Sequence, residues 1–210
     1  MQHAGIISQV RMGSTRLPGK VLLPAAGRPL LDYHVARLAQ SGLPLYLATT
    51  TEPADDALAA YAEAHGLPYH RGSETDVLAR YLADADPLEF RSNSIIRSFP
   101  RGLDFEIFSV QMLAEAHERA TSPFEREHVT PYFKTSPATA GRLRNVDEVW
   151  PGGDFSRFRI TLDTPQDYEV LRRLIEDHQA DQLAVPELLA LLEIHPEIMA
   201  LHAEIEQKTT

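Results

Sequence analysis

The sequence predicts an α/β fold built on a parallel sheet, and two observations carry that prediction. Short apolar runs alternate with amphipathic stretches in the N-terminal third of the chain, in the order strand, helix, strand, helix, strand. The chain has 210 residues, of which 43% are hydrophobic, so it is long enough to bury a core without disulfides or metals. We therefore expect one globular domain whose strands are joined by crossover helices.

The first elements follow from apolar runs and from the residues that end them. Residues 4–10 are apolar and run into the turn-rich segment 11–20, as a buried strand runs into a loop. A helix is expected after Pro29, with Gly42 in the C-terminal capping position. The pattern continues with an expected strand at 43–49, a helix at 55–65 and a strand at 68–71.

The remaining elements are less regular. Strands are expected at 94–98, 104–108 and 157–162, and helices at 74–82, 110–120, 166–178, 186–193 and 196–207. Pro165 stands at the start position of the helix at 166–178. The two final helices predict a main domain at 1–178 and a helical C-terminal appendage at 179–210.

Composition excludes several classes of protein. The chain has no cysteine, which removes thiolate catalysis and cysteine zinc sites. Its 20 basic and 30 acidic residues give a net charge of -10, which argues against nucleic acid as a partner. Apolar runs are too short to span a membrane and the N-terminus does not have the pattern of a signal peptide, so a cytoplasmic location is expected.

The first 31 residues hold four basic residues, Arg11, Arg16, Lys20 and Arg28, and no acidic one. The bland interpretation is a chance cluster on a solvated face. However, segment 11–20 should lie beyond the carboxyl end of the first strand, where open parallel sheets bind ligands. Its glycines allow close backbone approach and its cations suit phosphate oxygens, which favours a nucleoside triphosphate site. The segment matches neither the P-loop nor the dinucleotide fingerprint.

Residues 9–20 (QVRMGSTRLPGK) resemble the opening signature of the cytidylyltransferases that activate acidic sugars. The resemblance is to the branch of the spore coat polysaccharide biosynthesis protein F family, which is related to CMP-sialic acid and CMP-Kdo synthetases. Further similar motifs are 71–78 (RGSETDVL), 99–104 (FPRGLD), 125–132 (EREHVTPY), 162–167 (LDTPQD), 195–197 (HPE) and 205–208 (IEQK). These motifs keep their order and extend over most of the chain.

The resemblance implies a nucleotide-diphospho-sugar transferase fold, which is Rossmann-like and three-layered, with a mainly parallel central sheet and a C-terminal helical tail. It implies transfer of CMP from CTP to a sugar acid, with release of pyrophosphate, for surface polysaccharide biosynthesis. The implied partners are CTP and a sugar acceptor, and a homodimer is compatible with the family. A sugar nucleotidyltransferase that uses another base is the alternative within the same fold.

The resemblance also assigns roles to residues. Arg11 and Lys20 would be catalytic by stabilising the departing phosphates, and Mg²⁺ would be held by Asp163. The nucleotide would be bound by Gln9, Arg11, Gly13, Ser14, Arg16, Lys20, Gly72, Ser73 and Asp76. The alternative for Asp163 is an N-cap before Thr164, and the alternative for residues 72–76 is a turn followed by a helix cap.

Four residues are assigned to the side of the acceptor sugar: Arg101, Glu106, Glu125 and His128. An arginine there would grip the carboxylate of the substrate with two hydrogen bonds. The alternative, which we weigh equally, is a buried network of ion pairs.

The chain departs from the family pattern between Asp76 and Phe99. The family carries a helix, a core strand ending in Asp-x-Pro-Leu and a second helix there, but residues 79–98 are too few for them. Asp84 and Asp86 imitate the missing carboxylate without a preceding strand. Loss of a central strand is costly, so we favour a segment missing from the printed sequence. A real deletion would instead predict a nucleotide-binding homologue without catalysis.

Overall fold

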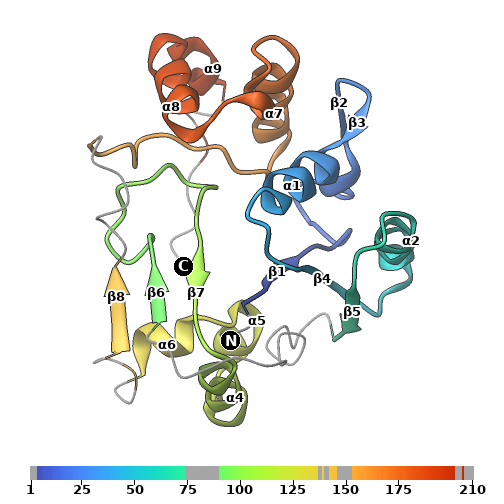
Figure 1. Cartoon of the computed structure of the whole chain (residues 1–210), viewed down its shortest axis with the longest axis vertical. Helices are drawn as coiled ribbons and strands as arrows, with labels where there is room; N and C mark the ends of the chain where they lie inside the picture. Colours follow the sequence, from blue (N-terminus) through green and yellow to red (C-terminus); the bar gives the residue numbers. More distant parts are fainter. Residues whose placement is uncertain are drawn as a thin grey trace.

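The computed structural model describes residues 4–73, 90–136, 139, 142–145, 153–201 and 205. Figure 1 shows two groups of strands on opposite sides of the view and the helices α7, α8 and α9 together above them. These helices are Pro165–Glu176, Val185–Ile194 and Pro196–Ala200. The expected helix at 74–82 lies outside the described residues.

The N-terminal part is the predicted parallel sheet. Strands β1 (Ile6–Gln9), β4 (Leu45–Thr50) and β5 (Tyr69–Gly72) pair in the order β1-β4-β5, and both pairings are parallel. Helices α1 (Leu30–Ala39) and α2 (Asp56–Ala64) are the crossovers between them. The alternation of strand and helix is therefore confirmed, with bounds that differ by one or two residues.

Glycines and an apolar cluster hold this part together. Gly42 and Gly66 follow α1 and α2 with φ of 71° and 63°, a backbone region that glycine enters at little cost. The core of the sheet is formed by Val10, Leu31, Leu47, Leu58 and Ala62. Shorter elements complete it: η1 (Lys20–Leu22), the β2 (Pro24–Ala25) and β3 (Arg28–Pro29) hairpin, and η2 (Pro53–Asp55).

The middle of the chain forms a second, mixed sheet. Its order is β7-β6-β8, with β6 at Phe90–Ser92, β7 at Glu106–Ile107 and β8 at Leu143–Asn145. The β6 strand is antiparallel to β7 and parallel to β8. Helices α4 (Val110–Arg119), α5 (Pro123–His128) and α6 (Pro131–Thr135) belong to this part, and their core includes Phe90, Met112, Leu113, Val129 and Phe133.

The strand expected at 94–98 is wrong, because residues 94–97 form a turn. Side chains take the hydrogen bonds that a strand neighbour would supply. The backbone N–H of Ser94 donates to the Ser92 hydroxyl at 3.0 Å, and that of Ile96 donates to the Asn145 amide oxygen at 2.8 Å. Such local bonds compete with ladder pairing, so the strand lies earlier, at β6.

The expected central sheet is present as two separate three-stranded sheets among the described residues. In that part of the chain β1 has one strand neighbour, β4. The first part of the segment 79–98, where the family carries a core strand, lies outside the described residues, which resume at β6. The short spacing therefore stays a finding of the sequence. The expected strand at 157–162 is reduced to one bridge, in which Arg159 pairs with Arg101.

The C-terminal helices share one core with the residues before them. Phe158 and the α7 residues Val170 and Leu174 pack with Leu189 and Leu192 of α8 in a single buried cluster. The short helix η4 (Ala180–Gln182) joins α7 to α8. The boundary at residue 178 stays a prediction, and apolar packing crosses it.

The search for membrane spans covered the described residues, and none of their helices is long and apolar enough to cross a bilayer.

Candidate active site

The basic loop follows β1, as predicted, and its backbone is folded onto one carbonyl group. The N–H groups of Ser14 and Gly19 both donate to the Met12 carbonyl, at 2.9 and 3.0 Å. Gly19 has φ of 67°, and a Cβ atom there would lie 3.3 Å from the Met12 Cε. A glycine therefore suits the end of this loop for backbone and steric reasons.

Asp55 anchors the loop to the end of β4, a role that sequence reasoning missed. Its carboxylate is 1% exposed and accepts from the Met12 N–H at 2.7 Å, the Thr49 hydroxyl at 2.9 Å and the Thr50 N–H at 3.0 Å. Burial acts to raise the pKa of Asp55, but the hydrogen bonds with Thr50, Met12 and Thr49 outweigh it, so the pKa lies below its ordinary value. The sequence signal that could have indicated this role is the pair Thr49 and Thr50 at the end of a strand, followed five residues later by Asp55.

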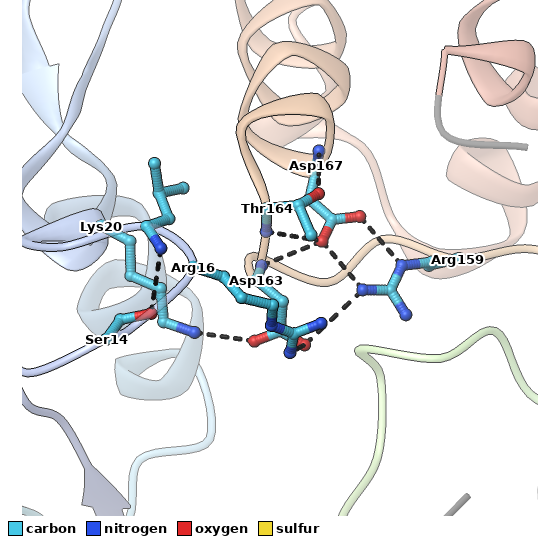
Figure 2. Close-up of polar contacts among 8 residues, drawn as sticks. Ser14, Arg16, Lys20, Arg159, Asp163, Thr164 and Asp167 are labelled. Atoms are coloured by element: carbon cyan, nitrogen blue, oxygen red, sulfur yellow. Dashed lines mark hydrogen bonds and ion pairs between the residues drawn. The ribbon is translucent and has the colours of Figure 1, made fainter. Parts of the chain in front are cut away.

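The structure brings Asp163 to this loop from the far end of the sequence. The Lys20 Nζ lies 2.8 Å from one carboxylate oxygen of Asp163, and the Arg16 Nη2 lies 3.3 Å from the other. Figure 2 shows the three side chains meeting between the loop and the start of α7. Asp163 keeps 35% of its side chain exposed, so ligand oxygens and water have access to it. One carboxylate and two cations here form a site suited to a phosphate group.

The capping alternative for Asp163 is wrong, because Thr164 is the N-cap of α7. The Asp167 N–H donates to the Thr164 hydroxyl at 3.1 Å, and the Asp167 carboxylate accepts from the Thr164 N–H at 3.0 Å. This reciprocal capping box leaves the carboxylate of Asp163 out of the cap. Asp163 is instead directed toward the loop.

The other predicted nucleotide residues that the structure describes lie at the same edge of the sheet. Gln9 ends β1 and Gly72 ends β5, and parallel strands carry their carboxyl ends to one edge. Arg11 is half-buried, Gly13 is exposed, and the Ser14 hydroxyl accepts from the Leu17 N–H at 3.3 Å. Ser73 directly follows β5. Asp76 lies outside the described residues.

The residues assigned to the acceptor are not gathered in one cluster. Glu106 accepts from Lys134 at 2.8 Å and from the Thr130 hydroxyl at 3.2 Å. Glu125 belongs to the capping box of α5, which gives its carboxylate a local structural task. His128 is exposed and lies edge-on to Phe124, with ring centroids 4.7 Å apart.

Of these four residues, Arg101 is paired with a residue that approaches the site, Arg159. Its N–H donates to the Phe158 carbonyl at 3.0 Å and its carbonyl accepts from the Ile160 N–H at 2.8 Å, which pairs it with Arg159. A cavity of about 200 Å³ is lined there by residues that include Arg101, Arg157, Phe158 and Arg159. Since Arg159 also approaches Asp163, with 3.6 Å between Nη2 and Oδ2, the cavity adjoins the candidate active site.

Comparison with known proteins identifies the family. A family model described as Cytidylyltransferase matches residues 4–99. The spore coat polysaccharide biosynthesis protein SpsF of Bacillus subtilis is 30% identical over 230 residues, which cover 91% of this chain and 94% of that protein. The chain belongs to the cytidylyltransferase family. Its candidate active site is thus built from two of the motifs through which the sequence resembles these enzymes.

Two solved structures are similar to this chain in fold. A cytidylyltransferase from Leptospira borgpetersenii superposes with a TM-score of 0.84 at 28% identity, covering 97% of this chain and 98% of that one. A CMP:2-keto-3-deoxy-manno-octonic acid synthetase complexed with CTP gives a TM-score of 0.54 at 17% identity and covers 86% of this chain and all of that one. The second likeness supports the fold of this cytidylyltransferase.

A further comparison gives an alignment that is longer than this chain. An uncharacterized protein of Methanocaldococcus jannaschii is 27% identical over an alignment of 245 residues, which covers all of this chain and 98% of that protein. Because this cytidylyltransferase has 210 residues, the alignment includes positions of the relative that have no counterpart here.

Proposed function

We propose that this protein transfers CMP from CTP to a sugar acid and releases pyrophosphate, as a step in surface polysaccharide biosynthesis. The observation that carries the proposal is the meeting of Asp163 with Lys20 and Arg16 at the carboxyl edge of the parallel sheet. The names of the relatives support the reaction class, since they include a spore coat polysaccharide biosynthesis protein and a 3-deoxy-manno-octulosonate cytidylyltransferase.

The chemistry suits a site of fixed charges. A sugar hydroxyl oxygen bonds to the α-phosphorus of CTP, the bond from that phosphorus to the bridging oxygen breaks, and pyrophosphate leaves with the electron pair. The hydroxyl proton passes to solvent. Lys20, Arg16 and Arg11 would stabilise charge on the departing phosphates, and the loop anchored by Asp55 would hold the α-phosphate in line.

The donor set at Asp163 fits Mg²⁺. This ion is commonly held by one or two carboxylates together with substrate phosphates and water. Among the described residues no group of three or more His, Cys, Asp and Glu side chains could hold a metal ion without such help. Asp163 would therefore share the metal with the triphosphate, and the bound ion would neutralise phosphate charge.

The acceptor is proposed to lie beside Arg101. The cavity that Arg101 lines has cationic and apolar side chains around it, and it adjoins Asp163 through Arg159. An arginine pairs with a carboxylate in a two-pronged geometry, which suits the acid group of a sugar acid. Glu106 remains a second proposed contact from the neighbouring sheet.

The test is a turnover assay with CTP, Mg²⁺ and a panel of sugar acids, followed by pyrophosphate release and by mass spectrometry of the CMP-sugar. Parallel reactions with ATP, GTP and UTP measure the choice of base. Asp163→Asn is the matched variant, because it keeps the shape of the side chain and removes its charge. We expect pyrophosphate from CTP only, and a large loss of Mg²⁺-dependent turnover in the variant. Preference for UTP or GTP would refute the cytidylyl assignment.

A second candidate is a homologue that binds CTP without turnover, which a real deletion of the middle segment would favour. Intact mass of the purified untagged protein separates the two. A mass clearly above 23.5 kDa would show that the natural chain carries the segment, which supports the enzyme. A mass of 23.5 kDa, with CTP binding and no pyrophosphate from any acceptor, would establish the second candidate.

A further inference from the structure

A buried ion pair lies directly behind Asp163. The Asp167 carboxylate is completely buried, and the Nε and Nη2 atoms of Arg159 donate to its two oxygens at 2.9 and 2.8 Å. The Arg159 side chain is only 12% exposed. This is a two-pronged arginine–carboxylate pair that holds both side chains in one geometry.

The pair contacts Asp163 at its backbone and at its carboxylate. The Asp163 N–H donates to the Asp167 Oδ2 at 3.0 Å, and the Arg159 Nη2 lies 3.6 Å from the Asp163 Oδ2. Figure 2 shows this pair on the α7 side of Asp163, opposite Lys20 of the loop. Asp163 therefore has two sets of partners. Asp167 and Arg159 lie on the side of α7, and Lys20 and Arg16 belong to the basic loop.

Capping of α7 accounts for only part of this arrangement. A capping box needs the reciprocal bonds between Thr164 and Asp167, and both are present. It does not need a buried arginine or a bond to the N–H of Asp163. Since burying an ion pair brings little net stability, the pair is poorly explained by stability alone.

We propose that Asp167 and Arg159 are positioning residues that hold the Asp163 carboxylate toward the loop for a metal-bound triphosphate. The inference rests on the proposed function, and it extends that function to the buried pair that contacts Asp163 from behind. Partners behind a metal ligand orient it, and their loss typically lowers metal affinity or activity by about 10–100-fold.

The experiment measures Mn²⁺ binding in the presence of CTP and without acceptor, from the electron paramagnetic resonance signal of free Mn²⁺. Asp167→Asn is the test variant, because the amide cannot accept both bonds from Arg159. Thr164→Ala is the matched control, since it removes the other half of the same capping box and leaves the pair and the bond to Asp163. We expect Mn²⁺ affinity to fall about tenfold or more in Asp167→Asn and to stay within about twofold in Thr164→Ala.

Thermal unfolding of both variants is the control for stability. Because both variants lose capping bonds, we expect their unfolding temperatures to fall together while their Mn²⁺ affinities differ. If Asp167→Asn does not fold, Arg159→Lys takes its place, because lysine keeps the charge and loses the two-pronged geometry. Equal Mn²⁺ affinity in the test and control variants would overturn this inference alone. A wild-type protein that binds no Mn²⁺ with CTP and releases no pyrophosphate would overturn the proposed function and this inference together.

Discussion

At the scale of single residues, the site depends on one carboxylate facing several cations. Asp163 contacts Lys20, Arg16 and Arg159, so its charge is more than balanced in the absence of ligand. Excess positive charge beside a half-exposed carboxylate attracts phosphate oxygens, because lysine and arginine each carry several N–H donors. Lys20 and Asp163 are therefore the residues whose substitution should affect turnover more than folding.

We predict that Lys20→Ala lowers the rate of pyrophosphate release from CTP by about 100-fold, the usual cost of removing one charged contact to a transition state. Its partly exposed ion pair with Asp163 contributes about 1 kcal/mol or less to stability, so urea unfolding should change little. Arg28→Ala is the control, because Arg28 belongs to the same basic region but pairs with Asp32 instead. Similar rates for the two variants would reject the role of Lys20.

Asp55 gives a prediction about pH. Its pKa is lower in the folded protein than the ordinary value near 4, so its stabilising effect is present above about pH 4 and is lost as pH falls through the folded value. Asp55→Asn should cost on the order of 2 kcal/mol at pH 7, since charged hydrogen bonds are lost. That difference from wild type should shrink as urea unfolding is repeated toward pH 2.

Asp56→Asn is the control for this measurement. Asp56 is the next residue, but its side chain is 68% exposed and its pairing with Arg71 lies at the surface. We expect its substitution to change the free energy of unfolding by less than about 0.5 kcal/mol at any pH. A difference between wild type and Asp55→Asn that stays constant with pH would contradict the role of the carboxylate.

At the scale of elements, the site depends on how segments from distant parts of the chain are joined. The bridge between Arg101 and Arg159 fixes the backbone just before Asp163. Gly102 makes the bridge possible, because it has φ of 101° and a Cβ atom there would lie 2.4 Å from the Ile160 carbonyl oxygen. No side chain fits in that space, which explains structurally why the motif at 99–104 has a glycine at this position.

We therefore predict that Gly102→Ala destabilises the protein by more than about 2 kcal/mol, since it combines a backbone clash with an unfavourable φ. Gly27→Ala is the control, because Gly27 has φ of 76° with no atom within 4 Å of its added Cβ. We expect Gly27→Ala to lower the free energy of unfolding by about 1 kcal/mol, because only the unfavourable φ contributes. Equal shifts in the midpoint of urea unfolding would show that the bridge tolerates displacement.

At the scale of the whole molecule, the C-terminal helices are part of the core that supports the site. Phe158 and α7 share their buried cluster with α8 and with Ile198 of α9. The Arg37 guanidinium of α1 also donates to the backbone carbonyls of Asp181 and Leu183, which ties the first crossover helix to the same end. The segment after residue 178 thus contacts both α7, which begins beside Asp163, and α1 of the N-terminal sheet.

We predict that a chain ending at residue 178 does not fold stably. Burial of each large apolar side chain contributes about 1.5–3 kcal/mol, and the lost cluster includes Leu188, Leu189, Leu192 and Ile198. That total is comparable with the whole stability of a typical domain, about 5–15 kcal/mol. Circular dichroism and sedimentation of the truncated chain provide the measurement, and a soluble, cooperatively unfolding product would contradict the prediction.

A pair of point variants tests the same packing without truncation. Leu192 is 1% exposed and Ile194, two residues later on α8, is 70% exposed. Leu192→Ala should cost about 2–5 kcal/mol by leaving a cavity, whereas Ile194→Ala should change stability by less than about 0.5 kcal/mol.

The sequence by itself determined the local elements and the chemistry of the loop. Apolar runs and their terminating glycines set β1, α1, β4, α2 and β5, because these depend on neighbours in the chain. The cluster of cations at 11–20, and its resemblance to the cytidylyltransferases, was likewise visible without coordinates. The prediction of a strand at 94–98 was wrong, because the side chains of Ser92 and Asn145 accept hydrogen bonds from backbone N–H groups that would otherwise pair with a neighbouring strand.

Only the tertiary structure decided which groups act on one another. Asp163 and Lys20 are 143 positions apart, and no local pattern could show that their charged atoms lie 2.8 Å apart. The same holds for Asp55 beneath the loop, whose carboxylate accepts from the N–H of Met12, 43 positions earlier in the chain. Local patterns report which face of an element is buried, whereas electrostatic partners are set by the packing of elements that the chain joins over long distances.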